Sequence, residues 1–178
     1  MQKPRKHWMV TAGLAATLFA GSWACKKQEE AGQEDTAPLT STLEMGSRRA
    51  ERQLLSGFWQ VENNAWRWTK HDFSVLLLVP VGAAQKGAML RVRFTLPDNI
   101  VAKRHSVTLS ASVDGVALPP ETYTAGGVYQ YEASVPATAF RGGSTVKAAF
   151  STDNYLAAGE IEARELALVV SNIALRPQ

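Results

Sequence analysis

The stretch MLRVRFTLP, residues 89–97, alternates between apolar and polar side chains. Its apolar members are Leu90, Val92, Phe94 and Leu96, and Arg91, Arg93 and Thr95 lie between them. Successive side chains of a β-strand point to opposite faces, so a period of two is typical of a strand with one buried and one wet face. We therefore expect this segment to be a strand whose odd-numbered residues meet water.

The same pattern recurs in four segments farther along the chain. These are residues 106–116, 128–136, 145–151 and 164–177. In the last of them the alternation slips near Ser171 and Asn172, which predicts a β-bulge there. Asp114-Gly115 predicts a hairpin turn, because both residues tolerate positive φ. Residues 72–81 are apolar without alternation, which is typical of a central strand covered on both sides.

These segments amount to seven to nine short strands, with no amphipathic helix long enough to cover a sheet. The sequence therefore predicts an all-β fold of two packed sheets, a β-sandwich over residues 55–178. A domain of this size can bury enough surface to fold without cross-links.

Residues 1–24 have a basic start, an apolar run and small residues before Cys25, as a secretory signal peptide does. Cys25 is the only cysteine of the chain, and GSWAC resembles the lipobox of bacterial lipoproteins, although Ser22 and Trp23 depart from the usual pattern. The resemblance implies that Cys25 is lipidated and anchors the chain to a membrane. Two alternatives remain, an ordinary cleaved signal and a membrane-spanning helix. Residues 25–54, polar and poor in aromatics, are expected to be a flexible, disordered linker.

Charge and composition exclude several functions. The net charge of +3 comes from Lys3, Arg5 and Lys6, and the rest of the chain is neutral, so nothing favours a nucleic-acid partner. Beyond the signal, the two histidines, His71 and His105, are expected in solvated loops. No zinc-ligand spacing, nucleophile elbow or phosphate-binding glycine loop occurs, so we expect no enzyme, metal or cofactor.

The tryptophans of NAWRWTKHDF, residues 64–73, allow three interpretations. Trp66 and Trp68 point the same way on a strand, whereas Arg67 points the opposite way. In the first, both rings and Trp59 form an exposed platform for sugar rings. In the second the rings fill the core, and in the third some rings are exposed and others are buried.

Residues 56–176 resemble a β-sandwich domain found beside bacterial glycosyltransferases and in envelope lipoproteins. The matching positions are Gly57, Phe58, Trp59, Glu62, Arg67, Trp68, Thr69, Glu162, Arg164 and Leu166, whereas Ala167 stands where that family prefers Gly. The resemblance implies a jelly-roll-like sandwich and a cell-envelope carbohydrate context. The motif allows two roles. A clamp between the first and last strands would consist of Glu62, Arg67, Trp68, Glu162 and Arg164. A ligand site would instead consist of Glu62 and Arg67 beside Trp59 and Trp66.

The sequence thus predicts a lipid-anchored, non-enzymatic module outside the cytoplasm, in the periplasm or at the cell exterior, with a glycan as the expected ligand. The alternative is a structural or assembly subunit that contacts another envelope protein through a sheet face or edge strand.

Overall fold

The computed structural model describes residues 38–140 and 142–178. The expected signal peptide and Cys25 lie outside these residues. In the described part the chain forms ten strands, of which seven have seven or more residues, so the predicted all-β class is confirmed. No helix in this part is long and apolar enough to cross a membrane.

In residues 38–140 and 142–178 the strands are joined by turns, loops, two short α-helices and two 3-10 helices. In chain order the elements are β1 (Thr42–Glu44), η2 (Arg48–Gln53), β2 (Leu54–Glu62), β3 (Trp66–Leu78), α2 (Ala83–Lys86), β4 (Ala88–Leu96), α3 (Asp98–Arg104), β5 (Val107–Val113), β6 (Val116–Ala117), β7 (Glu121–Tyr123), β8 (Gly127–Val135), η3 (Ala137–Phe140), β9 (Thr145–Thr152) and β10 (Val169–Pro177).

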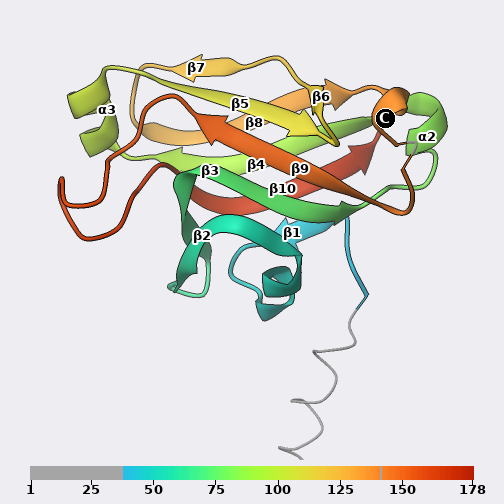
Figure 1. Ribbon diagram of the computed structural model, residues 1–178, viewed down its shortest axis with the longest axis horizontal. Helices are drawn as coiled ribbons and strands as arrows, with labels where there is room; N and C mark the ends of the chain where they lie inside the picture. The colour runs from blue at the N-terminus through green and yellow to red at the C-terminus, as the bar shows by residue number, and fades with distance from the viewer. Residues whose placement is uncertain (1–37, 141) are drawn as a thin grey trace, which may run out of the picture. The chain divides into compact units, whose positions relative to one another are not determined.

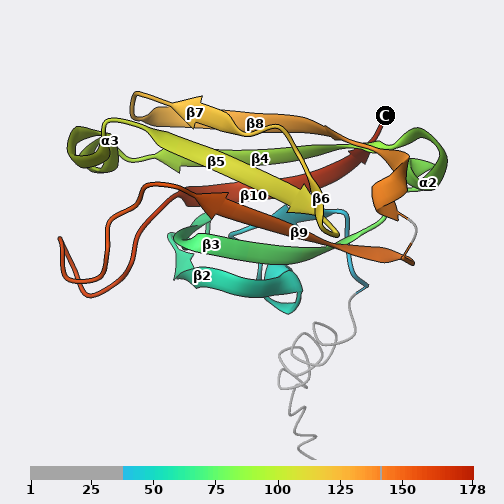
Figure 2. The ribbon, with the colours of Figure 1, turned by 45° about the horizontal axis from the view of Figure 1, so that its top comes forward.

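Two antiparallel layers face each other (Figures 1 and 2). The hydrogen-bonded path runs β6-β5-β9-β3-β10-β4-β8, with β3 shared by the two layers. The start of β3 pairs with β10 through Arg67 and Trp68. Its second half pairs with β9 from Asp72 to Leu78. The single long strand therefore closes one edge of the sandwich.

The core lies between the layers and follows the alternation of the sequence. Along β4 the even-numbered residues are buried from Ala88 to Leu96. Phe73 of β3 stacks on Phe150 of β9 with 4.8 Å between ring centroids. Residues 73–75 of β3 are buried in succession, but Leu76 is partly buried and Leu78 is exposed, so the apolar run is covered on both sides over only part of its predicted length.

Both predicted irregularities are confirmed. The pairing of β10 with β4 shifts register between Val170 and Asn172, which is the bulge expected from the slipped alternation. Asp114 and Gly115, with φ of 44° and 82°, form the tight turn between β5 and β6.

The folded part extends into the segment expected to be a linker. Residues 42–44 pair with β10 as β1, and Leu43 and Met45 are buried. Residues 48–53 form η2, capped by the Ser47 hydroxyl. A polar segment with few apolar residues cannot fold alone. Here β10 supplies the missing partner, which the composition of the segment does not reveal.

At Gly57 the backbone of β2 lies very close to the backbone of β3. The φ of Gly57 is +78°, and a Cβ there would lie 2.0 Å from the carbonyl oxygen of Asp72 on β3. We expect Gly57→Ala to lower the free energy of unfolding by more than about 2 kcal/mol, because backbone strain and a clash add. Urea unfolding of the purified protein measures the loss.

Gly115→Ala is the matched control for that change. Gly115 has a similar φ of +82°, but nothing lies within 4 Å of its Cβ position. Strain alone should cost about 1–2 kcal/mol. Equal losses in the two variants would contradict the close contact between β2 and β3.

Candidate functional site

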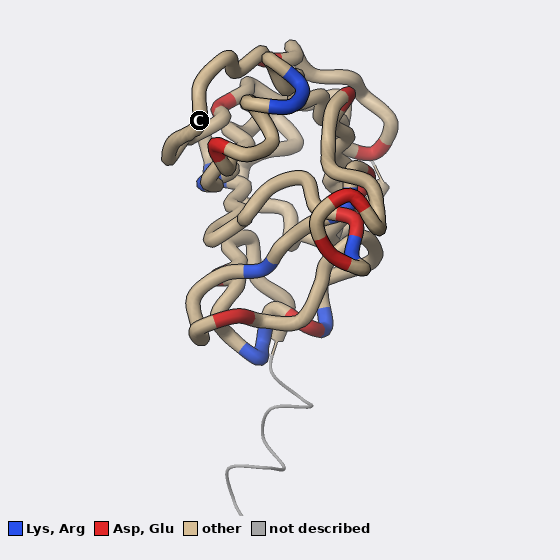
Figure 3. Tube along the Cα trace, turned by 90° about the vertical axis from the view of Figure 1, so that its left-hand side faces the viewer, with Lys and Arg blue, Asp and Glu red and all other residues tan. Residues whose placement is uncertain are grey.

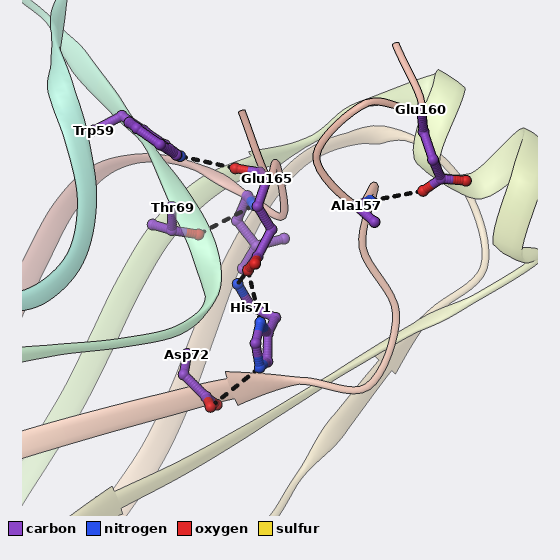
Figure 4. Close-up of polar contacts among 8 residues, drawn as sticks. Trp59, Thr69, His71, Asp72, Ala157, Glu160 and Glu165 are labelled. Carbon is purple, nitrogen blue, oxygen red and sulfur yellow. Dashed lines mark hydrogen bonds and ion pairs between the residues drawn. The ribbon is translucent and has the colours of Figure 1, made fainter. Parts of the chain in front are cut away.

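Trp59 lies where β2 meets the loop between β9 and β10, residues 153–168. Its indole Nε1 donates a hydrogen bond to the carbonyl oxygen of Glu165 at 2.7 Å (Figure 4). Lys70 Nζ lies 5.3 Å from the centroid of the indole, and Arg164 Cζ lies 5.8 Å from it. We call Trp59, Lys70, His71, Arg164 and Glu165 the tryptophan corner. The indole N–H is therefore occupied, and two cations already lie against the ring.

Arg164 joins the end of β2 to the loop before β10. Its Nη1 donates to Glu62 at 2.8 Å, and its Nε donates to Glu162. The hydrogen bonds that Arg164 donates to Glu162 and Glu62 raise the pKa of Arg164. Three residues of the predicted clamp, Glu62, Glu162 and Arg164, therefore lie together.

Arg67 has a different partner from the one the sequence suggests. Its side chain is 4% exposed, and Nη2 pairs with Glu51 of η2 at 2.9 Å. It also donates to the carbonyl oxygens of Met45 and Trp59. In the β2–β3 hairpin Glu62 stands opposite Trp66, and cross-strand partners share a face, so Arg67 points to the other face. The buried guanidinium is not available to a ligand.

The other two tryptophans are partly buried. Trp68 packs against the hydrophobic core, as Trp59 does. Trp66 lies at the first residue of β3, next to the turn at Asn63 and Asn64. Among the three interpretations of the rings, a single flat platform has the least support, because Trp59 and Trp68 contribute to packing.

His71 is a strand residue rather than the loop residue that the sequence suggests, because β3 continues without a break from Trp66 to Leu78. Its backbone N–H and ring Nδ1 contact Glu165 Oε1 at 2.7 and 2.6 Å. Its Nε2 lies 3.2 Å from Asp72 Oδ2, and its ring stacks on Tyr155. Both ring nitrogens face carboxylates, so neither is free to act on a substrate.

A second set of contacts holds the loop of residues 153–168 near its middle. Glu160 accepts a hydrogen bond from the Ala157 backbone N–H at 2.6 Å (Figure 4). It accepts another from Arg104 of α3. The Ala157 bond, followed by Arg104 and Lys103, lowers the pKa of Glu160 although burial opposes this. Acidic and basic positions lie close together at this end of the domain (Figure 3). The charged side chains at this end of the domain therefore largely pair with one another.

An open groove lies on another part of the surface, on the outward face of the β1, β10, β4 and β8 strands. Its volume is about 540 Å³, within the usual range for ligand sites. It is lined by Glu44, Ala65, Arg93, Thr95, Val128, Gln130, Ser171, Asn172 and Arg176. Most of these side chains are polar, which suits a ligand rich in hydroxyl or charged groups.

Four of the lining residues form a continuous row across four strands. Glu44 pairs with Asn172, Asn172 with Arg93, and Arg93 with Gln130. We call these four residues the polar row. Neighbouring strands lie about 4.8 Å apart, so the row spans about 14 Å. All four side chains end in planar groups that can make paired hydrogen bonds.

Neighbouring contacts orient the amides of the polar row. Asn172 Nδ2 donates to Glu44 Oε1 at 2.7 Å, and Gln130 Nε2 donates to Glu132 Oε1 at 2.6 Å. Thr95 and Val128 stand opposite each other beside the row, and Val128 is 66% exposed. The groove thus combines fixed polar groups with one apolar surface.

The sequence singled out none of the groove residues as a site. The alternation of residues 88–96 shows that Arg93 and Thr95 face water, and the predicted bulge turns Asn172 to the same face. The row itself depends on the pairing of β1, β10, β4 and β8, which brings together residues far apart in the chain. In the described part of the chain, no three His, Asp, Glu or Cys residues are placed to hold a metal ion.

No protein-family model matches this chain, and no curated protein matches its sequence. Among solved structures, it is similar to a carbohydrate-binding module, TmCBM27, that recognises mannan, at 10% identity and a TM-score of 0.46, over 79% of this chain and 98% of that one. It is similar to the CBM36-1 domain of a multidomain xylanase from the hindgut metagenome of Trinervitermes trinervoides, at 9% identity and a TM-score of 0.43, over 77% and 96%.

A third similar structure contains the second CBM51 domain of ZmpB from Clostridium perfringens, in complex with GlcNAc and together with INT domains. The identity is 9% and the TM-score 0.38, over 79% of this chain and 28% of that one.

Glu165 gives the tryptophan corner a pH-dependent stability. Burial alone would raise the pKa of this carboxyl, but the backbone and ring hydrogen bonds from His71 and the nearby positive charge lower it below its usual value near 4.5. A lowered pKa in the folded state stabilises the fold above the unfolded-state pKa, and the contribution is lost as the pH falls through the lowered value.

We expect Glu165→Gln to lower the free energy of unfolding by about 2 kcal/mol at pH 7, because hydrogen bonds to a charged acceptor are lost. The difference from the unmodified protein should shrink as the pH falls below 4.5. Urea unfolding at pH 7 and pH 3 checks this. Asp72→Asn, which removes a more exposed contact of the same histidine, should cost less than about 1 kcal/mol. A loss that is the same at both pH values would contradict the role of the Glu165 charge.

Proposed function

We propose that this chain is a lipid-anchored, non-enzymatic module of the cell envelope that binds glycan in the groove on the β1, β10, β4 and β8 face. The observation that carries the proposal is the polar row of Glu44, Asn172, Arg93 and Gln130, which lies on a rigid sheet and ends in planar hydrogen-bonding groups.

The chemistry of the groove supports a sugar over an apolar ligand. Sugar hydroxyls donate and accept hydrogen bonds in pairs, and carboxylates, amides and guanidinium groups match them. Exposed Val128 offers a surface for the apolar face of a sugar ring. The span of about 14 Å across four strands is longer than one sugar ring, which suits an oligosaccharide.

The tryptophan corner is less suited to binding than the groove. Its main polar groups already contact one another, and a ligand would have to replace those contacts. In the groove the two amides each make one such contact, but no carboxylate of the described residues pairs with Arg93 or Arg176. The corner instead holds the loop of residues 153–168 against β2 and β3. The engaged nitrogens of His71 also support a module that binds without catalysing a reaction.

Glycan-array binding separates the groove from the tryptophan platform that the sequence allows. We expect Gln130→Ala to weaken binding at least about tenfold, because the hydroxyls of the bound glycan lose an oriented hydrogen-bond partner. Trp66→Ala, on the β2–β3 hairpin, should change binding less than about twofold. Thermal unfolding of each variant confirms that the fold is intact. Loss of binding in Trp66→Ala alone would move the site to the tryptophans, and no binding of the unmodified protein to any glycan would refute the proposal.

The membrane anchor rests on the sequence around Cys25. It is a lone cysteine after the small residue Ala24 and an apolar stretch, and acyl chains on it would give stable attachment without any protein surface. We expect mass spectrometry of the protein purified from membranes to find an acylated Cys25 at the start of the mature chain. Cys25→Ser should release the protein into the soluble fraction. An unmodified cysteine in a freely secreted protein would contradict the anchor.

A second function, an assembly subunit, is favoured by the edge of β2. In the described residues β2 pairs with β3 alone, and Leu55 on it is 49% exposed. An edge of this kind can accept a strand from a partner protein. This function would gain support if the groove bound no glycan.

A further inference from the structure

We infer that the groove selects an acidic oligosaccharide, a chain of uronic acid sugars whose carboxylates are held by Arg93 and Arg176. The inference rests on the proposed glycan binding and specifies the class of sugar. It is carried by the net charge of the groove, by the position of the two arginines, and by the contrast with Arg67, Arg91, Arg104 and Arg164.

The two groove arginines differ from their neighbours in having no acidic partner. Arg91, two residues before Arg93 on the same strand, lies 2.9 Å from Glu132. The guanidinium groups of Arg67, Arg104 and Arg164 are paired with Glu51, Glu160 and Glu62. In residues 38–140 and 142–178, no carboxylate pairs with Arg93 or Arg176. Two cations therefore face the groove unneutralised.

The one carboxylate in the groove does not neutralise them. Glu44 accepts a hydrogen bond from Asn172 Nδ2 at 2.7 Å, and Asn172 lies between Glu44 and Arg93 in the polar row. The lining thus carries two guanidinium groups and one carboxylate, a net charge of +1. An anionic ligand would neutralise this positive charge, whereas a neutral ligand would leave both guanidinium groups without a counter-charge.

The separation of the two arginines indicates a chain with spaced charges. Arg93 stands opposite Asn172, and Arg176 is four residues farther along β10, so their Cα atoms are about 14 Å apart. Guanidinium groups bind carboxylates through two parallel hydrogen bonds. Along the strands, Ala174 and the neutralised Arg91–Glu132 pair lie between the two arginines. The amides of Gln130 and Asn172 stand level with Arg93, and Thr95 lies beyond it, so these groups face sugar hydroxyls at the Arg93 end of the groove. A densely charged polymer would meet the Glu44 carboxylate in the same row and be repelled.

Isothermal titration of the full chain with three polymers tests the inference. These are polygalacturonate, the same polymer fully methyl-esterified, and dextran sulfate. Esterification removes the charge and leaves the sugar backbone, and dextran sulfate supplies dense charge without carboxylates. We expect polygalacturonate to bind at least about tenfold more tightly than either of the others.

Charge-removing variants locate the selectivity. Arg93→Gln and Arg176→Gln are exposed substitutions that should each weaken polygalacturonate binding about tenfold, with the melting temperature unchanged. Lys147→Gln, which removes the same charge from the outward face of β9 in the other layer, is the matched control and should weaken binding less than about twofold.

Each other outcome overturns the inference in a different way. Equal binding of the methyl ester would show that the groove takes a neutral glycan, which leaves the proposed function intact. Equal binding of dextran sulfate, or an equal loss in Lys147→Gln, would indicate general charge attraction. If none of the three polymers binds but a glycan array finds a neutral ligand, only the acidic selectivity fails. If the array also finds no ligand, glycan binding itself fails.

Discussion

The fold depends on one strand being shared between two layers. Trp66–Leu78 pairs with β10 at its start and with β9 over its second half, so the two layers are held together by backbone hydrogen bonds as well as by packing. Phe73 lies in the half paired with β9 and stacks on Phe150. A strand that leaves one layer for the other must keep its side-chain alternation through the change. The uninterrupted length of β3 does this, and it also carries His71 and Arg67 into structural positions.

The position of the groove depends on the bulge in β10. Before the bulge Val170 is buried, and after it Ile173 and Leu175 are buried. An unbroken alternation would bury Asn172 along with Val170. The extra residue instead brings Asn172 opposite Arg93 on the outward face. One irregularity in the backbone, near the start of β10, therefore completes both the core and the polar row.

The sequence predicts the strands well because burial of one face leaves a period of two that can be read locally. The bulge and the Asp114-Gly115 turn are predicted for the same reason. Pairing between distant residues leaves no such trace. Glu62 and Arg67 are close in sequence and share a motif, yet Arg67 pairs with Glu51, because the hairpin register places them on opposite faces. Residues 42–53 look like a linker until β10 supplies their partner. The groove is hidden in the same way, since its residues come from β1, β4, β8, β10 and the β2–β3 turn.

The two polar regions of the domain differ in what their charges do. At the tryptophan corner the carboxylates hold the 153–168 loop: Glu165 accepts hydrogen bonds from the backbone of His71, and Glu62 and Glu162 accept from Arg164. In the groove the two guanidinium groups have no such task in the described part of the chain. Exposed unpaired cations contribute little to stability, so a fold has no structural need to gather them on one rigid face. For the proposed binding of an acidic glycan, the place of Arg93 beside oriented amides is favourable, because binding then costs little reorganisation.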